Sequence, residues 1–328
     1  MKIAFFSTKP YDKEFFEKYN QTNELTFYEV SLNESSVKLA EGFDAICIFV
    51  NDKVNVSIIE KLAQAGIKLI ALRSAGFNNV DLDAAKKANI TVVRVPAYSP
   101  HAVAEHAVAL IMTLNRKTHK AYNRVREGNF SLEKLIGFDL FQKTVGIIGT
   151  GKIGEVFARI MLGFGCKVIA YDITQNQILI DSGIKYCSFD EVLQQADIIS
   201  LHCPLTEKTL HLIDKQAIAK MKNGIMLINT SRGALIDTPA VVEALKSKKL
   251  GYLGLDVYEQ EANIFFNDLS EEILVDDTLA RLMSFPNVLI TSHQGFLTEE
   301  ALTQISVITF NNITAFEQRK KSGNEVFI

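Results

Sequence analysis

Three side chains that together could move a proton beside a bound carboxylate lie in the second half of the chain. Arg232, Glu261 and His293 each follow, within a few residues, the end of an apolar strand-like run. An imidazole can donate or accept a proton near neutral pH, and a neighbouring carboxylate favours its protonated form. A guanidinium can bind a carboxylate through two parallel hydrogen bonds. These residue types therefore indicate acid–base chemistry on an anionic substrate.

Each of these residues taken alone also has an ordinary structural explanation. An arginine after a strand can simply pair with an acid on the surface, and a lone histidine is often a satisfied structural residue. The acids Asp256, Glu259 and Glu261 could form a solvated loop, although Asp256 follows an apolar strand directly and fits that explanation less well. The carboxyl ends of parallel strands meet at one edge of a sheet. If the runs belong to one such sheet, the arginine, the glutamate and the histidine converge.

The element that must organise this sheet is a strand–turn–helix–strand unit at Lys143–Asp172. A short apolar run, Thr144–Ile148, leads into the sequence GTGKIG at Gly149–Gly154, and a helical pattern with one apolar face follows. A second apolar run then ends on Asp172. A bare glycine motif is weak evidence, but the flanking strands and the terminal acid complete the order that a dinucleotide site requires.

Each part of this unit has a physical role at such a site. Gly149 permits a tight exit from the strand, Gly151 lets the backbone approach a pyrophosphate, and Gly154 lets the helix pack against the strand. The N-terminus of the helix offers unpaired N–H groups to the phosphates. The carboxylate of Asp172 can accept hydrogen bonds from both ribose hydroxyls and would repel a 2′-phosphate. The unit therefore predicts NAD rather than NADP as the cofactor.

Composition and charge describe an ordinary globular protein. The chain has 328 residues, of which 48% are hydrophobic and 22% charged, which suits two domains with substantial cores. A net charge of −3 gives no electrostatic reason to expect a nucleic acid or an anionic membrane surface as a partner. The longest apolar stretch within an expected helix, 107–114, is too short to cross a bilayer.

The four cysteines do not indicate a metal site or a disulfide framework. They are scattered, with no CxxC pair, and three of them, Cys47, Cys166 and Cys203, lie in or beside apolar runs where a buried thiol is the expected state. The apolar run that follows Met1 is too short for a secretory signal. We therefore expect no bound metal and a reduced, cytoplasmic setting.

The rest of the chain alternates strand and helix patterns, which predicts an α/β fold with parallel sheets. PAYSP at 96–100 interrupts the alternation, and one long helix is expected from Pro100 to about Gly128 as a connector between domains. A final helix is expected from Thr298 to about Lys320, and 259–277 reads as an irregular but ordered, acid-rich excursion. Strands are expected at 3–7, 25–30, 44–50, 68–73, 91–95, 197–202, 224–229, 252–257 and 287–291.

Over essentially its whole length the chain resembles the D-2-hydroxyacid dehydrogenase family, and within it the fermentative D-lactate dehydrogenases of bacteria. The resemblance rests on long strings rather than isolated residues. They are ALRSAGFNNVDLDAA from Ala71, VPAYSPHAVAEHAVALIMTLNR from Val95, VGIIGTGKIG from Val145, SLHCPLT from Ser200, NTSRGALID from Asn229, LDVYE from Leu255 and SHQGFLTEEAL from Ser292.

The resemblance implies a role for each candidate residue. Arg232 would bind the substrate carboxylate and polarise the neighbouring carbonyl, and His293 would give a proton to the carbonyl oxygen while Glu261 holds it in place. Further residues would contact the cofactor: Lys152, Ile153, Cys203, Pro204, Thr209, Thr230, Ser231 and Asp256, the last near the nicotinamide amide. On the substrate side the implied residues are the N–H groups of Ala75 and Gly76 and the aromatic walls Tyr98 and Phe296.

The same resemblance implies two Rossmann-like or flavodoxin-like domains with the active site in the cleft between them. Residues 1–98 and 295–328 would form the substrate domain, and residues 99–294 the NAD-binding domain. The connector helix would form the face of a homodimer or homotetramer, and the small-molecule substrate pair would be pyruvate and D-lactate. Alternatives that remain open are another D-2-hydroxy acid, such as hydroxyisocaproate, glycerate or phosphoglycerate, and an NAD-sensing binding protein of the same fold. The resemblance to formate dehydrogenases is weaker.

Overall fold

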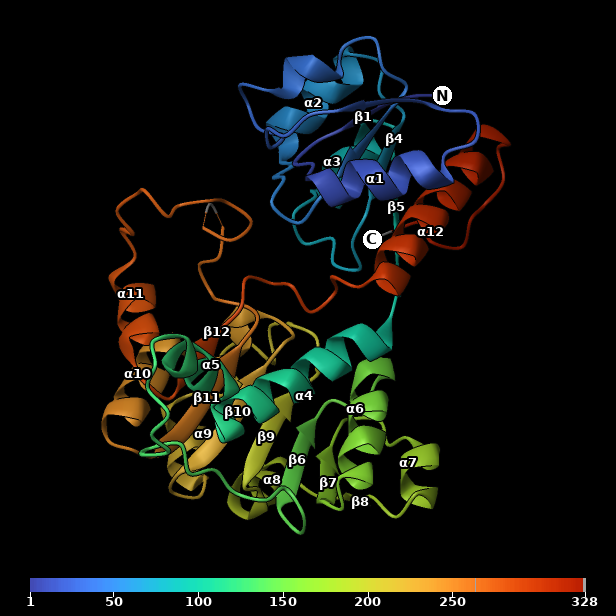
Figure 1. The fold of residues 1–328 in the computed structure, drawn as a ribbon. Helices are drawn as coiled ribbons and strands as arrows, with labels where there is room; N and C mark the ends of the chain where they lie inside the picture. Colours follow the sequence, from blue (N-terminus) through green and yellow to red (C-terminus); the bar gives the residue numbers. More distant parts are fainter. Residues whose placement is uncertain (263, 327–328) are drawn as a thin grey trace. The chain divides into compact units, whose positions relative to one another are not determined.

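The computed structural model describes residues 1–262 and 264–326. The chain divides into two compact units, which we call unit 1 (Met1–Ser99 with Leu297–Ile328) and unit 2 (Pro100–Phe296). Each unit is built on one sheet in which every paired strand is parallel to its neighbour (Figure 1). The predicted α/β class with two parallel sheets is confirmed.

Unit 1 has a five-stranded sheet with the order β2-β1-β3-β4-β5. Its strands are short and largely apolar, and helix α12, from the far end of the chain, packs against α1 and over β4 and β5. All five strands were expected, but α1 was not, since its sequence PYDKEFFEKY buries only Asp12 and Phe16. The elements are β1 (Lys2–Phe5), α1 (Pro10–Tyr19), β2 (Glu24–Phe27), η1 (Val37–Ala40), β3 (Ala45–Ile48), α2 (Val56–Gln64), β4 (Leu69–Leu72), α3 (Leu82–Lys87), β5 (Thr91–Arg94) and α12 (Glu299–Glu317).

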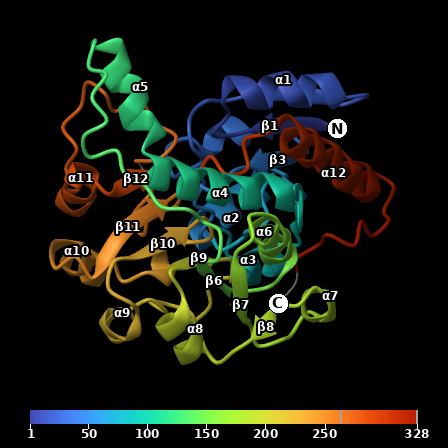
Figure 2. The ribbon, with the colours of Figure 1, turned by 60° about the horizontal axis from the view of Figure 1, so that its bottom comes forward.

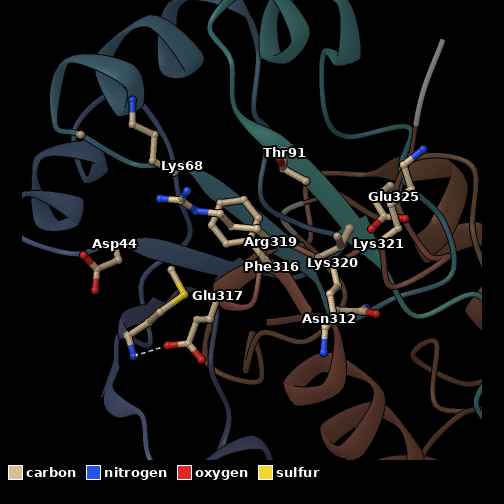
Figure 3. Close-up of a pocket in the computed structure, with 13 residues that line it drawn as sticks. Asp44, Lys68, Thr91, Asn312, Phe316, Glu317, Arg319, Lys320, Lys321 and Glu325 are labelled. Carbon is tan, nitrogen blue, oxygen red and sulfur yellow. Dashed lines mark hydrogen bonds and ion pairs between the residues drawn. The ribbon is translucent and has the colours of Figure 1, made fainter. Parts of the chain in front are cut away.

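A cavity of about 930 Å³ opens at the amino edge of this sheet, between the starts of the strands and the end of α12 (Figure 3). The acids around it are already engaged. Glu317 pairs with the N-terminal amine of Met1 at 2.9 Å, and Asp44 accepts the Lys2 N–H at 2.7 Å. Glu325 accepts N–H groups of the neighbouring turn. Because open α/β sheets bind ligands at the carboxyl edge, the functional site is expected at the other end of the strands.

Unit 2 has a seven-stranded sheet with the order β12-β11-β10-β9-β6-β7-β8. The chain runs outward from β6 in one direction and then returns to begin again at β9, so the switch in direction falls between β6 and β9, where such sheets bind ligands. The elements are α4 (Pro100–Arg116), α5 (Thr118–Arg126), β6 (Thr144–Ile148), α6 (Lys152–Gly163), β7 (Lys167–Tyr171), α7 (Gln177–Asp181), β8 (Lys185–Tyr186), α8 (Phe189–Gln195), β9 (Ile198–Leu201), α9 (Lys215–Lys220), β10 (Ile225–Asn229), η2 (Gly233–Leu235), α10 (Thr238–Lys246), β11 (Leu250–Leu255), α11 (Asp277–Ser284) and β12 (Val288–Ile290).

Two apolar cores cover the two faces of this sheet. On one face α4 and α6 bury residues such as Leu110, Ile111 and Phe157 against the strands. On the other face α8, α9 and α10 bury residues such as Leu193 and Val241 (Figures 1 and 2). β9 and β10 are buried along their whole length, as expected for central parallel strands. The strands that carry the candidate residues at their carboxyl ends are therefore packed on both faces.

The expected single connector helix is wrong, because the structure divides it at Lys117 into α4 and α5. Lys117 has a φ of 52°, in the left-handed region, which ends the regular helix. Its Nζ donates to the carbonyls of Lys134 and Ile136 at 3.0 and 2.8 Å, so the turn is held by a segment that comes later in the chain. α4 lines a core, whereas α5 buries none of its residues. The bend lies where the apolar pattern of the helix stops.

The segment 259–277 is irregular, as expected, with its residue Asn263 outside the described part of the chain. Phe265 is 5% exposed and packs into the core of unit 2, which agrees with an ordered excursion. The helix that follows, α11, was not expected. It begins where Asp276 accepts the Leu279 N–H. Two further small elements, α7 and β8, were also missed.

The cysteines are free thiols in the described structure. Cys47 and Cys166 are buried, as expected, while Cys203 is half-buried. Within residues 1–262 and 264–326, no group of His, Cys, Asp and Glu side chains has an arrangement that could hold a metal ion. In the same residues, no helix combines the length and the apolar character needed to cross a membrane.

Candidate active site

The glycine turn after β6 lies at the point where the sheet changes direction. Gly149 has a φ of 95°, and a Cβ there would lie 2.6 Å from the backbone N of Cys203, which follows β9. A Cβ on Gly154 would overlap the Gly149 carbonyl oxygen. Both positions therefore exclude any larger residue. The close packing of helix on strand that the motif predicted is confirmed.

Helix α6 begins at this turn with its first backbone N–H groups available. Its N-cap is Gly151, which has no side chain to accept them, and nothing lies within 4 Å of the place where a Gly151 Cβ would stand. Lys152 and Ile153 form the first positions of the helix. The N-terminus of a helix carries partial positive charge and free donors, so this open space fits a phosphate group.

Asp172 directly follows β7 and lies beside the same turn. Its Oδ2 accepts the Thr150 N–H at 2.6 Å and the Thr150 hydroxyl at 3.1 Å, and its Oδ1 accepts the Thr174 N–H at 3.1 Å. The hydroxyl of Tyr186 in turn donates to the Thr150 Oγ1 at 2.8 Å. These contacts fix the carboxylate at the carboxyl end of β7, where the predicted ribose-binding acid belongs.

The loops after β9 and β10 continue this edge. Thr209 Oγ1 donates to the Pro204 carbonyl at 2.7 Å, and Ser231 Oγ donates to a carbonyl at the end of β9 at 2.8 Å, so both hydroxyls shape the loops. Burial raises the pKa of Cys203 to about 11, so its thiol stays neutral. Thr230 Oγ1 is buried without a hydrogen-bond partner in the described residues. Such an atom needs a partner, and it fits a site that holds a polar cofactor group.

Arg232 follows β10 with most of its guanidinium available. Its Nη1 donates to the Ser231 carbonyl at 2.7 Å, and in the described part of the chain it forms no ion pair with an acid. A Cβ on Gly233 would overlap the backbone of Tyr258, so this loop lies directly against the segment that follows β11. The alternative of a surface arginine paired with a nearby acid therefore does not describe Arg232.

Glu261 and His293 form the contact that the sequence predicted. The His293 Nδ1 lies 3.0 Å from the Glu261 Oε1, and Glu261 Oε2 accepts the Tyr258 N–H at 3.1 Å. The two side chains are 18% and 23% exposed, so both are shielded but still reach solvent. The ring of Phe266 lies beside the imidazole, with centroids 5.8 Å apart. Nε2 has no hydrogen-bond partner among the described residues.

In unit 1, the predicted substrate residues Ala75 and Gly76 lie in the loop after β4. The carbonyls of Ala75 and Gly76 are held by the Arg94 guanidinium and the Ser74 hydroxyl at 2.8 and 2.9 Å. Their own N–H groups have no partner in the described part of the chain. Successive free N–H groups of this kind attract anions. Tyr98 lies later in unit 1 and is half-buried, whereas Phe296, the last residue of unit 2, is buried.

Comparison with known families decides what these features belong to. A model described as the NAD binding domain of the D-isomer specific 2-hydroxyacid dehydrogenases matches residues 108–295. The chain belongs to this family. As such it is an NAD-dependent oxidoreductase of 2-hydroxy acids, and the free helix N-terminus, the strand-end Asp172 and the unpartnered Thr230 hydroxyl fit the NAD that the family binds.

Similar proteins agree over the full length of the dehydrogenase. It is 53% identical over 330 residues to a 2-hydroxyacid dehydrogenase homolog of Haemophilus influenzae, with 99% of both chains covered. It is 50% identical over 328 residues to the D-lactate dehydrogenase of Escherichia coli, with 99% of this chain and 100% of the other covered. A structure reported as the pyruvate reductase of Chlamydomonas reinhardtii has a TM-score of 0.94 at 47% identity, with 99% of this chain and 98% of the other covered.

Asp256, which the sequence predicted as a cofactor contact, is buried in the dehydrogenase and is hydrogen-bonded by the protein itself. The residue is 1% exposed, and both of its carboxylate oxygens accept hydrogen bonds from the protein. Burial acts to raise its pKa, but donors led by His106 and Thr291 hold the pKa of Asp256 below its ordinary value. Contact with the nicotinamide amide stays a prediction. The sequence did not single out His106, which sits in a helix pattern that reads as core.

If Asp172 reads the adenosine ribose, Asp172→Ala should weaken the preference of the dehydrogenase for NADH over NADPH. A hydrogen bond to a charged group contributes about 1.5–3 kcal/mol, so the ratio of kcat/KM for the two cofactors should fall by about tenfold to a hundredfold. Asp181→Ala, which removes an exposed acid from nearby α7, should leave the ratio at its original value. If the ratio were unchanged in Asp172→Ala, another residue would be responsible for distinguishing NADH from NADPH.

Proposed function

We propose that this dehydrogenase reduces pyruvate to D-lactate with NADH, and that it catalyses the reverse oxidation. The observation that carries the proposal is the contact between His293 and Glu261, which engages Nδ1 and leaves Nε2 open at the carboxyl edge of the sheet. An arginine without an acid partner lies at the same edge. Relatives at about half identity named as D-lactate dehydrogenase support the choice of substrate.

In this proposal Arg232 binds and orients the substrate. With Nη1 held by the Ser231 carbonyl, Nε and Nη2 have no partner among the described residues and remain as a pair of donors. They bind the carboxylate of pyruvate and draw electron density from the adjacent carbonyl. We propose the N–H groups of Ala75 and Gly76, which have no partner among the described residues, as further donors to the same carboxylate.

His293 then transfers the proton. Its Nδ1–H donates to Glu261, which sets the orientation of the ring and stabilises the imidazolium, so that Nε2 carries the proton to be delivered. NADH, held by the glycine turn and Asp172, would supply the hydride for the carbonyl carbon. As the oxygen gains negative charge, Nε2–H passes its proton to it and D-lactate results. In the oxidation of lactate, neutral His293 accepts the hydroxyl proton at Nε2.

Tyr98 and Phe296 bear on the size of the substrate. In this proposal both residues form aromatic walls around the side chain of the substrate, and such walls suit the methyl group of pyruvate better than a phosphorylated acid. A hydrophobic pocket discriminates by only about 1–3 kcal/mol for each methylene, so longer 2-oxoacids should be slower substrates rather than inert ones. This ordering separates a lactate enzyme from a dehydrogenase for hydroxyisocaproate.

Steady-state kinetics with pyruvate and NADH, followed by chiral analysis of the lactate, test the proposal. We expect D-lactate as the product and a higher kcat/KM for pyruvate than for 2-oxoisocaproate, hydroxypyruvate or phosphohydroxypyruvate. A higher value for one of these acids would transfer the function to that substrate. NADH binding without turnover of any of them would favour an NAD-sensing binding protein instead.

We propose further that the protein forms a homodimer or a larger homo-oligomer through α5 and the loop after it. α5 buries no residue, and large apolar side chains project from it and from the following loop. Their exposed fractions lie between 52% and 84%. A group of exposed apolar side chains from one stretch of chain is typical of an interface. The residues are Tyr122, Val125, Phe130, Leu132, Ile136 and Phe141.

The double variant Leu132→Glu/Ile136→Glu should therefore lower the mass of the assembly to that of a smaller species, because it places charges within the apolar contact. Light scattering after size-exclusion chromatography measures this mass directly. Ile273→Glu alters an equally exposed apolar residue outside the stretch and should leave the mass unchanged. If the double variant keeps the mass of the wild type, this surface does not hold the assembly together.

A further inference from the structure

On helix α4, the imidazole of His106 contacts the buried carboxylate of Asp256, which is hydrogen-bonded to the turn that contains His293. His106 Nε2 is 3.2 Å from Asp256 Oδ1 and 3.0 Å from Thr291 Oγ1. The His106 side chain is 14% exposed and that of Asp256 only 2%, so the contact is shielded from water. All three residues belong to unit 2. Neither the sequence pattern nor the reaction described above assigns a role to this histidine.

Asp256 in turn holds the backbone around His293. Its carbonyl accepts the N–H of His293 at 2.7 Å. Its carboxylate accepts the next two N–H groups, that of Gln294 on Oδ1 at 2.9 Å and that of Gly295 on Oδ2 at 2.8 Å. Three consecutive backbone donors therefore end on one residue. The position of the His293 side chain depends on that residue staying in place.

The turn needs this support because His293 has a φ of 51°. A non-glycine residue in the left-handed region is strained and persists only where its surroundings hold it. Glu261 contacts the imidazole of His293. The backbone conformation is held by the hydrogen bonds that the Asp256 carboxylate accepts from the next two N–H groups. Moving the carboxylate would release the turn and change the direction in which Nε2 points.

The pattern of donors indicates how His106 acts on the carboxylate. Thr291 Oγ1 donates to Asp256 Oδ1 at 2.5 Å, so the same hydroxyl can accept a hydrogen bond from the His106 Nε2–H. That N–H faces both the hydroxyl and the carboxylate, and it locks the rotamer of each. Because Nε2 is occupied in this way and shielded from water, His106 is not placed to exchange protons with a substrate.

We propose that His106 is a positioning residue for the reaction: through Asp256 it fixes the turn 293–295 and so aims Nε2 of His293 at the substrate. The proposal rests on the proposed function, since it presumes that His293 transfers the proton. It identifies α4 as part of the support for the catalytic residue, and it explains why a polar side chain stands on a helix face that otherwise packs against the core.

Two substitutions at one position test the proposal. His106→Phe keeps an aromatic ring, though a larger one, and removes the donor, and it should lower kcat for pyruvate by about tenfold to a hundredfold. The KM for pyruvate should stay within about threefold, because Arg232 stands on a separate loop. His106→Gln offers an amide N–H in place of the imidazole N–H and should recover most of kcat. Equal losses in both variants, or a wild-type kcat in His106→Phe, would overturn the proposal.

A second buried side chain of α4 supplies the matched control for a purely structural role. Asn115 accepts the Phe138 N–H at 2.8 Å and donates to its carbonyl at 2.7 Å, in a loop outside the candidate site. Asn115→Leu should lower the midpoint of urea unfolding and keep kcat within about twofold. In a His293→Ala background, His106→Phe should cause no further loss of kcat. A full additional loss there would mean that His106 acts by some route other than His293.

The outcome for the proposed function is read separately from the wild-type protein. If the wild type fails to reduce every 2-oxoacid in the panel, the function fails, and His106 is then judged from ¹H–¹⁵N spectra of labelled imidazoles. The ring signals of His293 should shift in His106→Phe and stay in place in Asn115→Leu. Unchanged His293 signals in His106→Phe would overturn the positioning role whatever the substrate.

Discussion

His293→Ala should lower kcat for pyruvate reduction by about 10²–10⁴-fold, the range typical of a lost general acid. Without the imidazole, no side chain of the described residues is placed to give a proton to the carbonyl oxygen as hydride reaches the carbon. Water must then supply that proton. The substitution leaves the glycine turn, Asp172 and Arg232 intact, so the dissociation constant of NADH, measured by fluorescence, should stay within about threefold. Stopped-flow reduction with saturating pyruvate separates this loss from slower product release.

The same unit holds a second histidine–glutamate pair that serves as a matched control. His211 Nε2 lies 2.6 Å from Glu259 Oε1, in the loop after β9. His211→Ala removes an imidazole that likewise contacts a glutamate, with a side chain 40% exposed against 18% for His293, and it should leave kcat within about twofold. If His211→Ala lost activity as severely as His293→Ala, or if His293→Ala kept it, the assignment of the proton donor would be wrong.

Glu261 acts on the same step and should have a smaller effect. Glu261→Gln keeps an acceptor oxygen for His293 Nδ1 but removes the charge that stabilises the imidazolium. We expect kcat to fall less than in His293→Ala, with the KM for pyruvate nearly unchanged. This order of effects follows from the geometry, since Glu261 contacts the histidine and, among the described residues, no hydrogen bond or ion pair joins it to Arg232.

The parts of the fold that could be predicted from the sequence are those that depend on neighbours along the chain. The glycine turn at Gly149 could be predicted because its strand, turn and helix are consecutive in the sequence. The contact between Glu261 and His293 could be predicted because both residues follow strands of one parallel sheet. The carboxyl ends of such strands lie at the same edge of the sheet. In both cases a local pattern and one general rule sufficed.

The features that were missed depend on distant segments. The break at Lys117 is held by the carbonyls of Lys134 and Ile136, which no helical pattern before the break can indicate. α1 is covered by α12 from the opposite end of the chain. His106 reads as one more position in a buried helix, and only its distance to Asp256 gives it a distinct setting. Contacts of this kind require the folded chain.

Arg232→Lys should raise the KM for pyruvate by about tenfold to a hundredfold. An ammonium is a point charge that cannot make the two parallel hydrogen bonds of a guanidinium, and each hydrogen bond to a charged group contributes about 1.5–3 kcal/mol. kcat should fall as well, because the carbonyl is less polarised and less well oriented. Arg159→Lys, at an exposed ion pair on α6, should change neither constant.

A neutral substrate analogue turns this prediction into a test of the contact itself. Pyruvamide has the reacting carbonyl of pyruvate but an amide in place of the carboxylate. If Arg232 binds the carboxylate, the wild type should use pyruvamide poorly, and Arg232→Lys should add little to that loss, because the interaction is already absent. If the substitution raised KM equally for both compounds, Arg232 would act on something other than the carboxylate, and the carboxylate-binding role would have to pass to other donors such as the N–H groups of Ala75 and Gly76.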